Sequence, residues 1–180
     1  MNHWKGNKDL TLTSKGDDLD TMKWFIDASH AVHQDVRGHT GGGFTLGKGL
    51  THNRSAKQKL NAKSSTKAEL VGVDDALPQV SWTNCFMREQ GCESMETVVH
   101  QDNKSATSLE KNGELSSSDR TKHVNVRCFF VKDCIERKEL SVEFLGADEM
   151  WADFHAKPLQ GKKFEEFRKM TLNLEEQRKK

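Results

Sequence analysis

Four acidic residues occupy positions from which they could hold divalent cations. Each lies at the end of an expected helix or strand rather than on the exposed face of a helix, and they are Asp27, Glu69, Asp102 and Asp153. Asp27 follows Phe25 and Ile26 inside an apolar strand, where a carboxylate is costly unless its charge is compensated. Carboxylates on neighbouring strands would repel each other unless cations lay between them, and oxygen ligands of this kind suit Mg²⁺ or Mn²⁺. The four residues together therefore predict a divalent-metal site.

Each carboxylate, taken singly, also has a structural explanation. Asp27 could accept a hydrogen bond from a turn amide, and Asp102 could cap the helix that follows it. Glu69 would close a capping box that begins at Thr66, and Asp153 falls early in a helix, where the dipole favours acidic residues. The prediction of a metal site thus depends on the four residues being brought together.

The elements that would position these residues begin with a meander. Apolar alternation over residues 23–29 predicts a strand, and the glycine-rich run 39–43 predicts a turn-rich connection to short strands at 44–48 and 52–56. A helix is expected from Thr66 towards Gly91, with a break or kink at Pro78. The first half of the chain is therefore expected to be three antiparallel strands and a helix.

The second half alternates strands with helices. Residues 97–101 and 140–145 predict strands, separated by a helix over about 103–112, a loop at 116–118 and a helix from His123. A last helical region is expected to begin near Asp148, to be interrupted at Pro158 and to resume over residues 162–174. Strands separated by helices need crossover connections and pair in parallel. The sequence thus predicts an α/β fold with a mixed five-stranded sheet, three antiparallel strands and then two parallel ones, flanked by helices.

Composition indicates a polar globular domain. The 180 residues are 34% hydrophobic and 31% charged, the mean hydropathy is -0.80, and no apolar run approaches the roughly 20 residues that cross a bilayer. The spacing of the four cysteines matches neither a metal-binding pair nor a disulfide framework, which favours an intracellular protein with reduced thiols. The formal net charge is +1, yet no acidic residue lies between Asp35 and Glu69, so that basic segment predicts a locally positive face.

Five blocks of sequence, in order, resemble the ribonuclease H domain of copia-type (Ty1/copia, Pseudoviridae-like) retrotransposon Pol polyproteins. They are KWFIDASHAVHQDVRGHTGG, KGLTHNRSAKQKLNAKSSTKAELVGVDDALPQVSW, QDNKSA, SSSDRTKHVNVRCFFVKD and DEMWADFHAKPLQGKKF. The resemblance implies a ribonuclease H fold in which the four carboxylates form the catalytic set. It also implies that residues 1–20 connect to an upstream polymerase domain, that 21–160 form the ribonuclease H domain, and that 161–180 are a C-terminal helix and charged tail.

The chemistry implied is metal-dependent hydrolysis of the RNA strand of an RNA/DNA hybrid. Two Mg²⁺ or Mn²⁺ ions would activate the attacking water and stabilise the leaving oxygen. We expect Asp27 to bridge them, Glu69 and Asp102 to hold one ion, and Asp153 to hold the other. The expected partners are the hybrid and an adjacent reverse transcriptase domain, with no membrane partner, in the cytoplasm within virus-like particles. The residues expected to contact the nucleic acid are Ser29, then Arg54, Lys57 and Lys59 of the basic segment, and Asn103 and Ser105 at the start of the helix after residue 102.

Two other functions stay open on the sequence alone. An integrase or transposase core of the same fold class would use Asp102 with Glu139, although Glu139 precedes a strand and Glu69 and Asp153 would then have no role. A non-catalytic domain that binds nucleic acid or supports a polymerase would keep the same residues without turnover.

The histidines carry two further, weaker expectations. A zinc site built from His30, His33 and His39 fits on spacing alone. His155, two residues after Asp153, is expected at the surface, and no mechanistic role follows for His123.

Overall fold

The computed structural model describes residues 10–17, 19–92, 94–112 and 122–174, with side chains for all of these except 122–125. Its centre is a five-stranded sheet in the order β5-β3-β2-β6-β7. These strands are β2 (Thr21–Ser29), β3 (His39–Thr45), β5 (His52–Lys57), β6 (Glu96–Gln101) and β7 (Ser141–Phe144). Neighbours among β5, β3 and β2 are antiparallel, whereas β6 runs parallel to β2 and β7 parallel to β6. The predicted mixed sheet, three antiparallel strands followed by two parallel ones, is confirmed.

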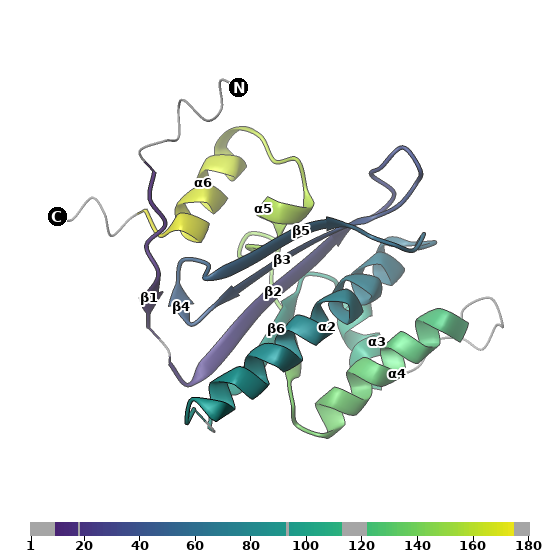
Figure 1. Cartoon of the computed structure of the whole chain (residues 1–180). Coiled ribbons are helices and arrows are strands. Elements are labelled where there is room, and N and C mark those ends of the chain that lie inside the picture. The colour runs from purple at the N-terminus through teal and green to yellow at the C-terminus, as the bar shows by residue number, and fades with distance from the viewer. Residues whose placement is uncertain (1–9, 18, 93, 113–121, 175–180) are drawn as a thin grey trace.

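Helices cover both faces of this sheet (Figure 1). One face carries α2 (Ser65–Glu89), α3 (Lys104–Asn112) and α4 (Lys122–Glu136), and the other carries α5 (Asp153–Ala156) and α6 (Gly161–Leu172). Among the described residues, none of the helices combines the length and apolar character that crossing a bilayer requires.

Alternation along β2 divides the core between these two faces. Trp24 and Ile26 pack with Val73 of α2 in the larger hydrophobic cluster, whereas Phe25 packs with Leu50 and Met150 on the side of α5. Successive residues of a strand point to opposite faces, so Asp27 shares the α5 face with Phe25. The central strand therefore carries a carboxylate on the face that the C-terminal part of the chain covers.

The described part of the N-terminal segment packs against the end of α6. A two-stranded sheet joins β1 (Lys15–Gly16) to β4 (Gly47–Lys48), and the backbone N–H of Thr13 donates to the carbonyl of Leu172 at 3.1 Å. The side-chain amide of Asn173 donates to the carbonyl of Thr13, also at 3.1 Å. Residues before position 10 and after position 174 lie outside the described part.

Three expectations about secondary structure are wrong. Residues 39–43 are not a turn but the first five residues of β3, whose glycines leave room for close packing from the neighbouring elements. The helix α2 runs through Pro78 without a break, because Leu77 and Val80 on either side are buried in the core and tertiary packing offsets the missing N–H. Residues 147–149 form a turn rather than the start of a helix, which begins only at Asp153. The loop expected at 116–118 lies outside the described residues.

Candidate active site

The register between β2 and β6 brings the first two carboxylates side by side. Phe25 pairs with His100 across the parallel strands, so Asp27 and Asp102, each two residues further on, reach the carboxyl ends of these strands together. Asp27 is completely buried, and the side chain of Asp102 is 16% exposed. The cap of α3 is Asn103, whose Oδ1 accepts the N–H of Ala106 at 3.0 Å. Asp102 is therefore not needed as a helix cap.

Glu69 comes from the opposite side of β2, in the second turn of α2. The helix is capped by Ser64, whose hydroxyl accepts the N–H of Lys67 at 3.3 Å, so the expected capping box at Thr66 is wrong and Glu69 has no capping role. Instead, the Glu69 side chain is buried and its carboxylate interacts with the backbone N–H of Ala28. One carboxylate oxygen from each of Asp27, Glu69 and Asp102 lies within 4.8 Å of the other two.

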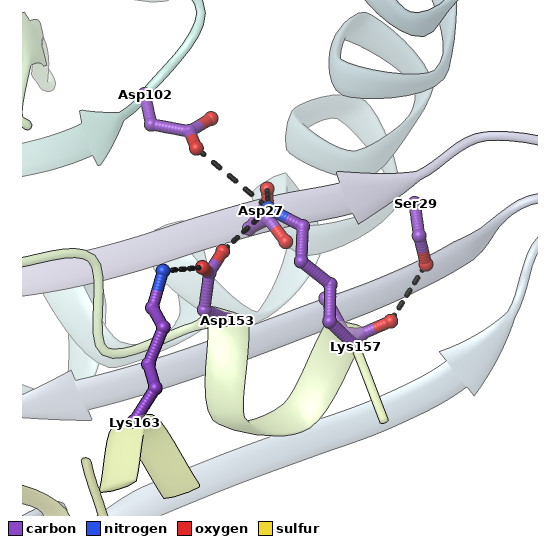
Figure 2. A network of polar contacts seen from close by, with 7 residues as sticks. Asp27, Ser29, Asp102, Asp153, Lys157 and Lys163 are labelled. Carbon is purple, nitrogen blue, oxygen red and sulfur yellow. Dashed lines mark hydrogen bonds and ion pairs between the residues drawn. The ribbon is translucent and has the colours of Figure 1, made fainter. Parts of the chain in front are cut away.

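Asp153 reaches the same place from the other face of the sheet. It is the first residue of α5, it is buried, and Lys157 connects it to Asp27 and Asp102 (Figure 2). The Lys157 ammonium lies 2.6 Å from Asp153 Oδ1, 3.1 Å from Asp27 Oδ1 and 3.7 Å from Asp102 Oδ2. Lys163 of α6 lies 3.2 Å from Asp153 Oδ2. The structure thus gathers all four predicted carboxylates at one end of the sheet.

Burial and the charges of neighbouring carboxylates make Asp27 and Glu69 weaker acids than usual, because both effects raise the pKa. Burial raises the pKa of Asp27 to about 7, against the opposing effect of Lys157, and the nearby charges of Asp153 and Asp102 raise it further. Burial, followed by the charges of Asp27 and Asp102, raises the pKa of Glu69 to about 10. Groups that resist losing their protons in this way are typical of sites where a bound cation stabilises the ionised form.

The donor set fits divalent cations. Asp27 Oδ2 and Glu69 Oε2 are both buried, and neither has a hydrogen-bond partner in the part of the chain that the structure describes. Buried carboxylate oxygens without donors are rare unless an ion or a water satisfies them. Several such oxygens facing one another suit Mg²⁺ or Mn²⁺ better than a softer metal.

The short helix α5 is fastened to the sheet by two serines. Ser29 donates to the carbonyl of Ala156 at 2.6 Å, and Ser55 donates to the carbonyl of His155 at 2.8 Å. Both bonds are to the backbone of α5, so they fix the position from which Asp153 projects.

Gly41 of β3 permits the close approach of α5 to the sheet. It pairs with Asp27 across the strands, and a Cβ at this position would lie 2.5 Å from the carbonyl oxygen of Ala152 and 2.5 Å from the backbone N of Ala156. We expect Gly41→Ala to lower the melting temperature, because forcing an extra methyl into a packed site costs about 1–3 kcal/mol.

The adjacent glycine provides a matched control for thermal melts. A Cβ at Gly42 would meet nothing closer than the carbonyl oxygen of Phe25 at 3.8 Å, so Gly42→Ala should melt close to the original protein. Equal melting of the two variants would contradict the close packing of α5.

Most of the six expected nucleic-acid contacts have partners within the protein. The hydroxyl of Ser29 holds α5, and Asn103 caps α3. Arg54 donates to the carbonyl of Asp75 at 2.7 Å, and Lys57 lies 2.7 Å from Asp35 Oδ2 at the border of the basic segment. The other two, Lys59 and Ser105, are exposed.

The structure does not support the integrase-type alternative. The carbonyl of Glu139 accepts the side-chain amide of Asn84 at 2.9 Å, and both residues line a pocket with Met22 near the start of β2. Asp27 and Asp102 lie at the other end of their strands. Asp102 and Glu139 therefore do not form a common site.

The histidines do not form the expected cluster. The rings of His33 and His39 face each other with 3.0 Å between Nε2 and Nδ1, whereas His30 Nε2 lies 3.0 Å from the carbonyl of Ala62. The His155 side chain is half-buried rather than at the surface, and burial lowers its pKa. The side chain of His123 lies outside the described residues.

The sequence interpretation missed Lys157 and Lys163, which contact the carboxylates directly. A signal for Lys157 was present, because a lysine four residues after Asp153 lies on the same side of one helical turn. Lys163 lies on α6, which begins at Gly161 after Pro158. Its contact with Asp153 therefore depends on how α5 and α6 pack, which the local sequence does not indicate.

The sequence was compared with families and individual proteins that are already known. No model of a known protein family matches the chain. It is 32% identical over 145 residues, 80% of its length, to the retrovirus-related Pol polyprotein from transposon TNT 1-94 of Nicotiana tabacum. It is 31% identical over 114 residues, 63% of its length, to the corresponding polyprotein from transposon RE2 of Arabidopsis thaliana. The chain spans only 11% and 8% of the length of these two relatives.

A solved structure gives the fold. A ribonuclease H isolated from compost, in complex with an RNA/DNA hybrid, superposes with a TM-score of 0.55 at 15% identity, covering 74% of this chain and 92% of that one. Its architecture agrees with the mixed sheet and flanking helices described above. Over most of its length the chain is thus similar to one part of the retrovirus-related Pol polyproteins of plant transposons, and it has the ribonuclease H fold.

Proposed function

We propose that this domain is a divalent-metal-dependent endonuclease that hydrolyses the RNA strand of RNA/DNA hybrids. The observation that carries the proposal is the convergence of four carboxylates from β2, α2, the end of β6 and α5 at one end of the sheet. The solved structure with the same fold, which holds an RNA/DNA hybrid, supports the choice of substrate.

The four carboxylates divide into two groups that overlap at Asp27. Asp27, Glu69 and Asp102 present oxygens within 4.8 Å of one another and would hold one ion, whereas Asp27 and Asp153 face each other across the Lys157 ammonium and would hold the second. Two such ions, when bound, activate a water and stabilise the leaving oxygen of the phosphodiester. Asp27, as the shared ligand, fixes the distance between the two groups. Glu69 lies beside the backbone of Ala28, where a 2′-hydroxyl of the RNA strand could be recognised.

The nucleic acid would be held mainly through its phosphates. Exposed Lys59 lies two residues after the end of β5, and exposed Ser105 lies in the first turn of α3, shortly after Asp102. Arg54 and Lys57 would join them by exchanging their present partners for phosphate, which their exposed positions permit. Contacts of this kind position the hybrid without reading its sequence.

The relatives supply the biological setting of the proposal. They are retrovirus-related Pol polyproteins, and we propose that this domain acts in reverse transcription beside a polymerase domain of its parent polyprotein, in the cytoplasm within virus-like particles. Residues 1–20 would connect it to that polymerase domain, residues 21–160 would be the ribonuclease H domain proper, and residues 161–180 would form its C-terminal helix and tail.

Cleavage of a labelled RNA/DNA hybrid tests the proposal. In Mg²⁺ or Mn²⁺ we expect the RNA strand of the hybrid to be cut, and double-stranded DNA and double-stranded RNA to stay intact. Asp102→Asn removes a ligand that is partly exposed, so this control should fold normally and lose cleavage. A folded protein that binds the hybrid in a gel-shift assay without cutting it would support the non-catalytic alternative instead.

A further inference from the structure

The ammonium of Lys157 lies where three of the four carboxylates converge. Its distances are 2.6 Å to Asp153 Oδ1, 3.1 Å to Asp27 Oδ1 and 3.7 Å to Asp102 Oδ2, and Figure 2 shows the side chain directed between them. The three carboxylates come from α5, β2 and the residue after β6. The Lys157 ammonium thus contacts carboxylate oxygens from three separate parts of the chain. A divalent cation bound at this place would contact the same carboxylates.

The backbone holds this lysine in place. The helix α5 ends at Ala156, and the N–H of Lys157 donates to the carbonyl of Asp153 at 2.9 Å. Lys157 then adopts an extended conformation, with φ -125° and ψ 144°, as expected for a residue before a proline. Its side chain is 33% exposed, so it lies partly buried among the carboxylates and partly open to solvent. The backbone at the end of α5 therefore places the Lys157 side chain beside the carboxylates.

The charges around Lys157 explain why it stays there. Burial disfavours its charged form, but the carboxylates of Asp27, Asp153 and Asp102 together raise its pKa above the ordinary lysine value. Lys163 contacts Asp153 alone, from α6, and its side chain is 41% exposed. Of the two lysines, Lys157 is the one that neutralises the shared ligand Asp27.

We propose that Lys157 is the internal counter-cation of the active site, which a divalent ion must displace in order to bind between Asp27 and Asp153. This inference rests on the proposed function, because it concerns the same carboxylates. In the metal-free protein the ammonium keeps Asp27 and Asp153 together at the distance that the structure shows. When the second ion binds, the ammonium moves towards solvent. Lys157 thereby weakens the binding of that ion and stabilises the protein in its absence.

The test is a titration of the whole chain with Mn²⁺, in which electron paramagnetic resonance measures the free ion. Lys157→Met keeps the aliphatic stem and removes the charge. Lys162→Met makes the same chemical change at a side chain that is 89% exposed and pairs with Glu166. We expect Lys157→Met to tighten the weaker phase of Mn²⁺ binding about tenfold, because a unit charge close to a dication is removed from a partly desolvated site. Lys162→Met should bind Mn²⁺ as the original protein does.

Thermal melts give a second readout that does not depend on activity. Without metal, Lys157→Met should melt below the original protein, because the carboxylates lose their counter-charge, and saturating Mn²⁺ should remove most of that difference. A binding curve identical to that of the original protein, or weaker binding in Lys157→Met, overturns the inference while leaving the proposed function intact. Failure of the original protein to bind Mn²⁺ at millimolar concentration overturns both.

Discussion

Asp27→Asn is expected to abolish cleavage of the RNA/DNA hybrid while leaving the protein folded. Asp27 is the carboxylate that both groups of ligands share, and it is completely buried at the end of the central strand. Loss of a partner that only orients a metal ligand typically costs 10–100-fold in metal affinity or activity, so loss of the shared ligand itself should lower the cleavage rate by more than about 100-fold. Asparagine has nearly the same shape, and its carbonyl oxygen can still accept the Lys157 ammonium.

The measurement is the initial rate of RNA-strand cleavage in Mg²⁺, with circular dichroism to verify folding. Asp133→Asn serves as the matched control, because Asp133 pairs with Arg137 on the exposed side of α4, far from the carboxylate cluster in the chain's fold. The control should cleave at the original rate. If Asp27→Asn retained more than about a tenth of the original rate, Asp27 would not be the ligand that both ions share.

Glu69→Gln is expected to stabilise the metal-free protein although it removes a proposed metal ligand. The pKa of Glu69 is raised from its ordinary value of 4.5 to about 10, chiefly by burial and then by the charges of Asp27 and Asp102. Below the ordinary value both the folded and the unfolded chain hold the proton. As pH rises from 4.5 towards 10 the unfolded chain ionises first, and the free energy of unfolding of the metal-free protein falls across that window. Glutamine has no proton to lose and escapes this penalty.

Melting temperatures measured against pH, in EDTA and in Mg²⁺, test the Glu69 prediction. Each unit of pKa shift is worth up to about 1.4 kcal/mol, and with allowance for relaxation of the site we expect Glu69→Gln to gain about 2 kcal/mol near pH 7.5, or about 4–8 °C. The advantage should shrink towards pH 4.5 and should also shrink in Mg²⁺, which stabilises the original protein by binding its ionised carboxylates. A variant that is less stable than the original protein in EDTA near pH 7.5 would show that Glu69 is ionised and compensated in the metal-free fold.

The positions of Asp27 and Asp102 could be predicted from the sequence because each lies at a boundary that local patterns mark. Asp27 interrupts an apolar strand, and Asp102 separates a strand from a helix, so periodicity alone places both at strand ends. The helical crossovers imply parallel pairing of the later strands, which is why the mixed sheet was predicted correctly, whereas the order of the strands was not predicted.

The failures arose where close tertiary contacts override local preference. Residues 41–43 have the composition of a turn, yet they lie within β3, where α5 packs closely on Gly41 and Leu50 packs closely on Gly43. Pro78 would end an isolated helix, but the buried residues around it keep α2 continuous. The hydrogen bond from the Ser29 hydroxyl to the carbonyl of Ala156, 127 positions away, likewise could not be predicted from the sequence. Contacts across such separations leave no local pattern in the sequence.

The contact between Lys157 and Asp27 also has a consequence for the order in which the chain folds. The two residues are 130 positions apart, so the charge that neutralises the central strand is synthesised well after that strand. Once β6 and Asp102 have left the ribosome, the carboxylates of Asp27, Glu69 and Asp102 can already come together. The Lys157 ammonium has not yet been synthesised at that stage. Bringing these carboxyls together at that stage requires protons or free Mg²⁺ in place of the lysine, because buried like charges repel strongly. This end of the sheet is therefore expected to reach its native packing late in folding. Free magnesium in the cell would then promote folding of the domain before it takes part in cleavage.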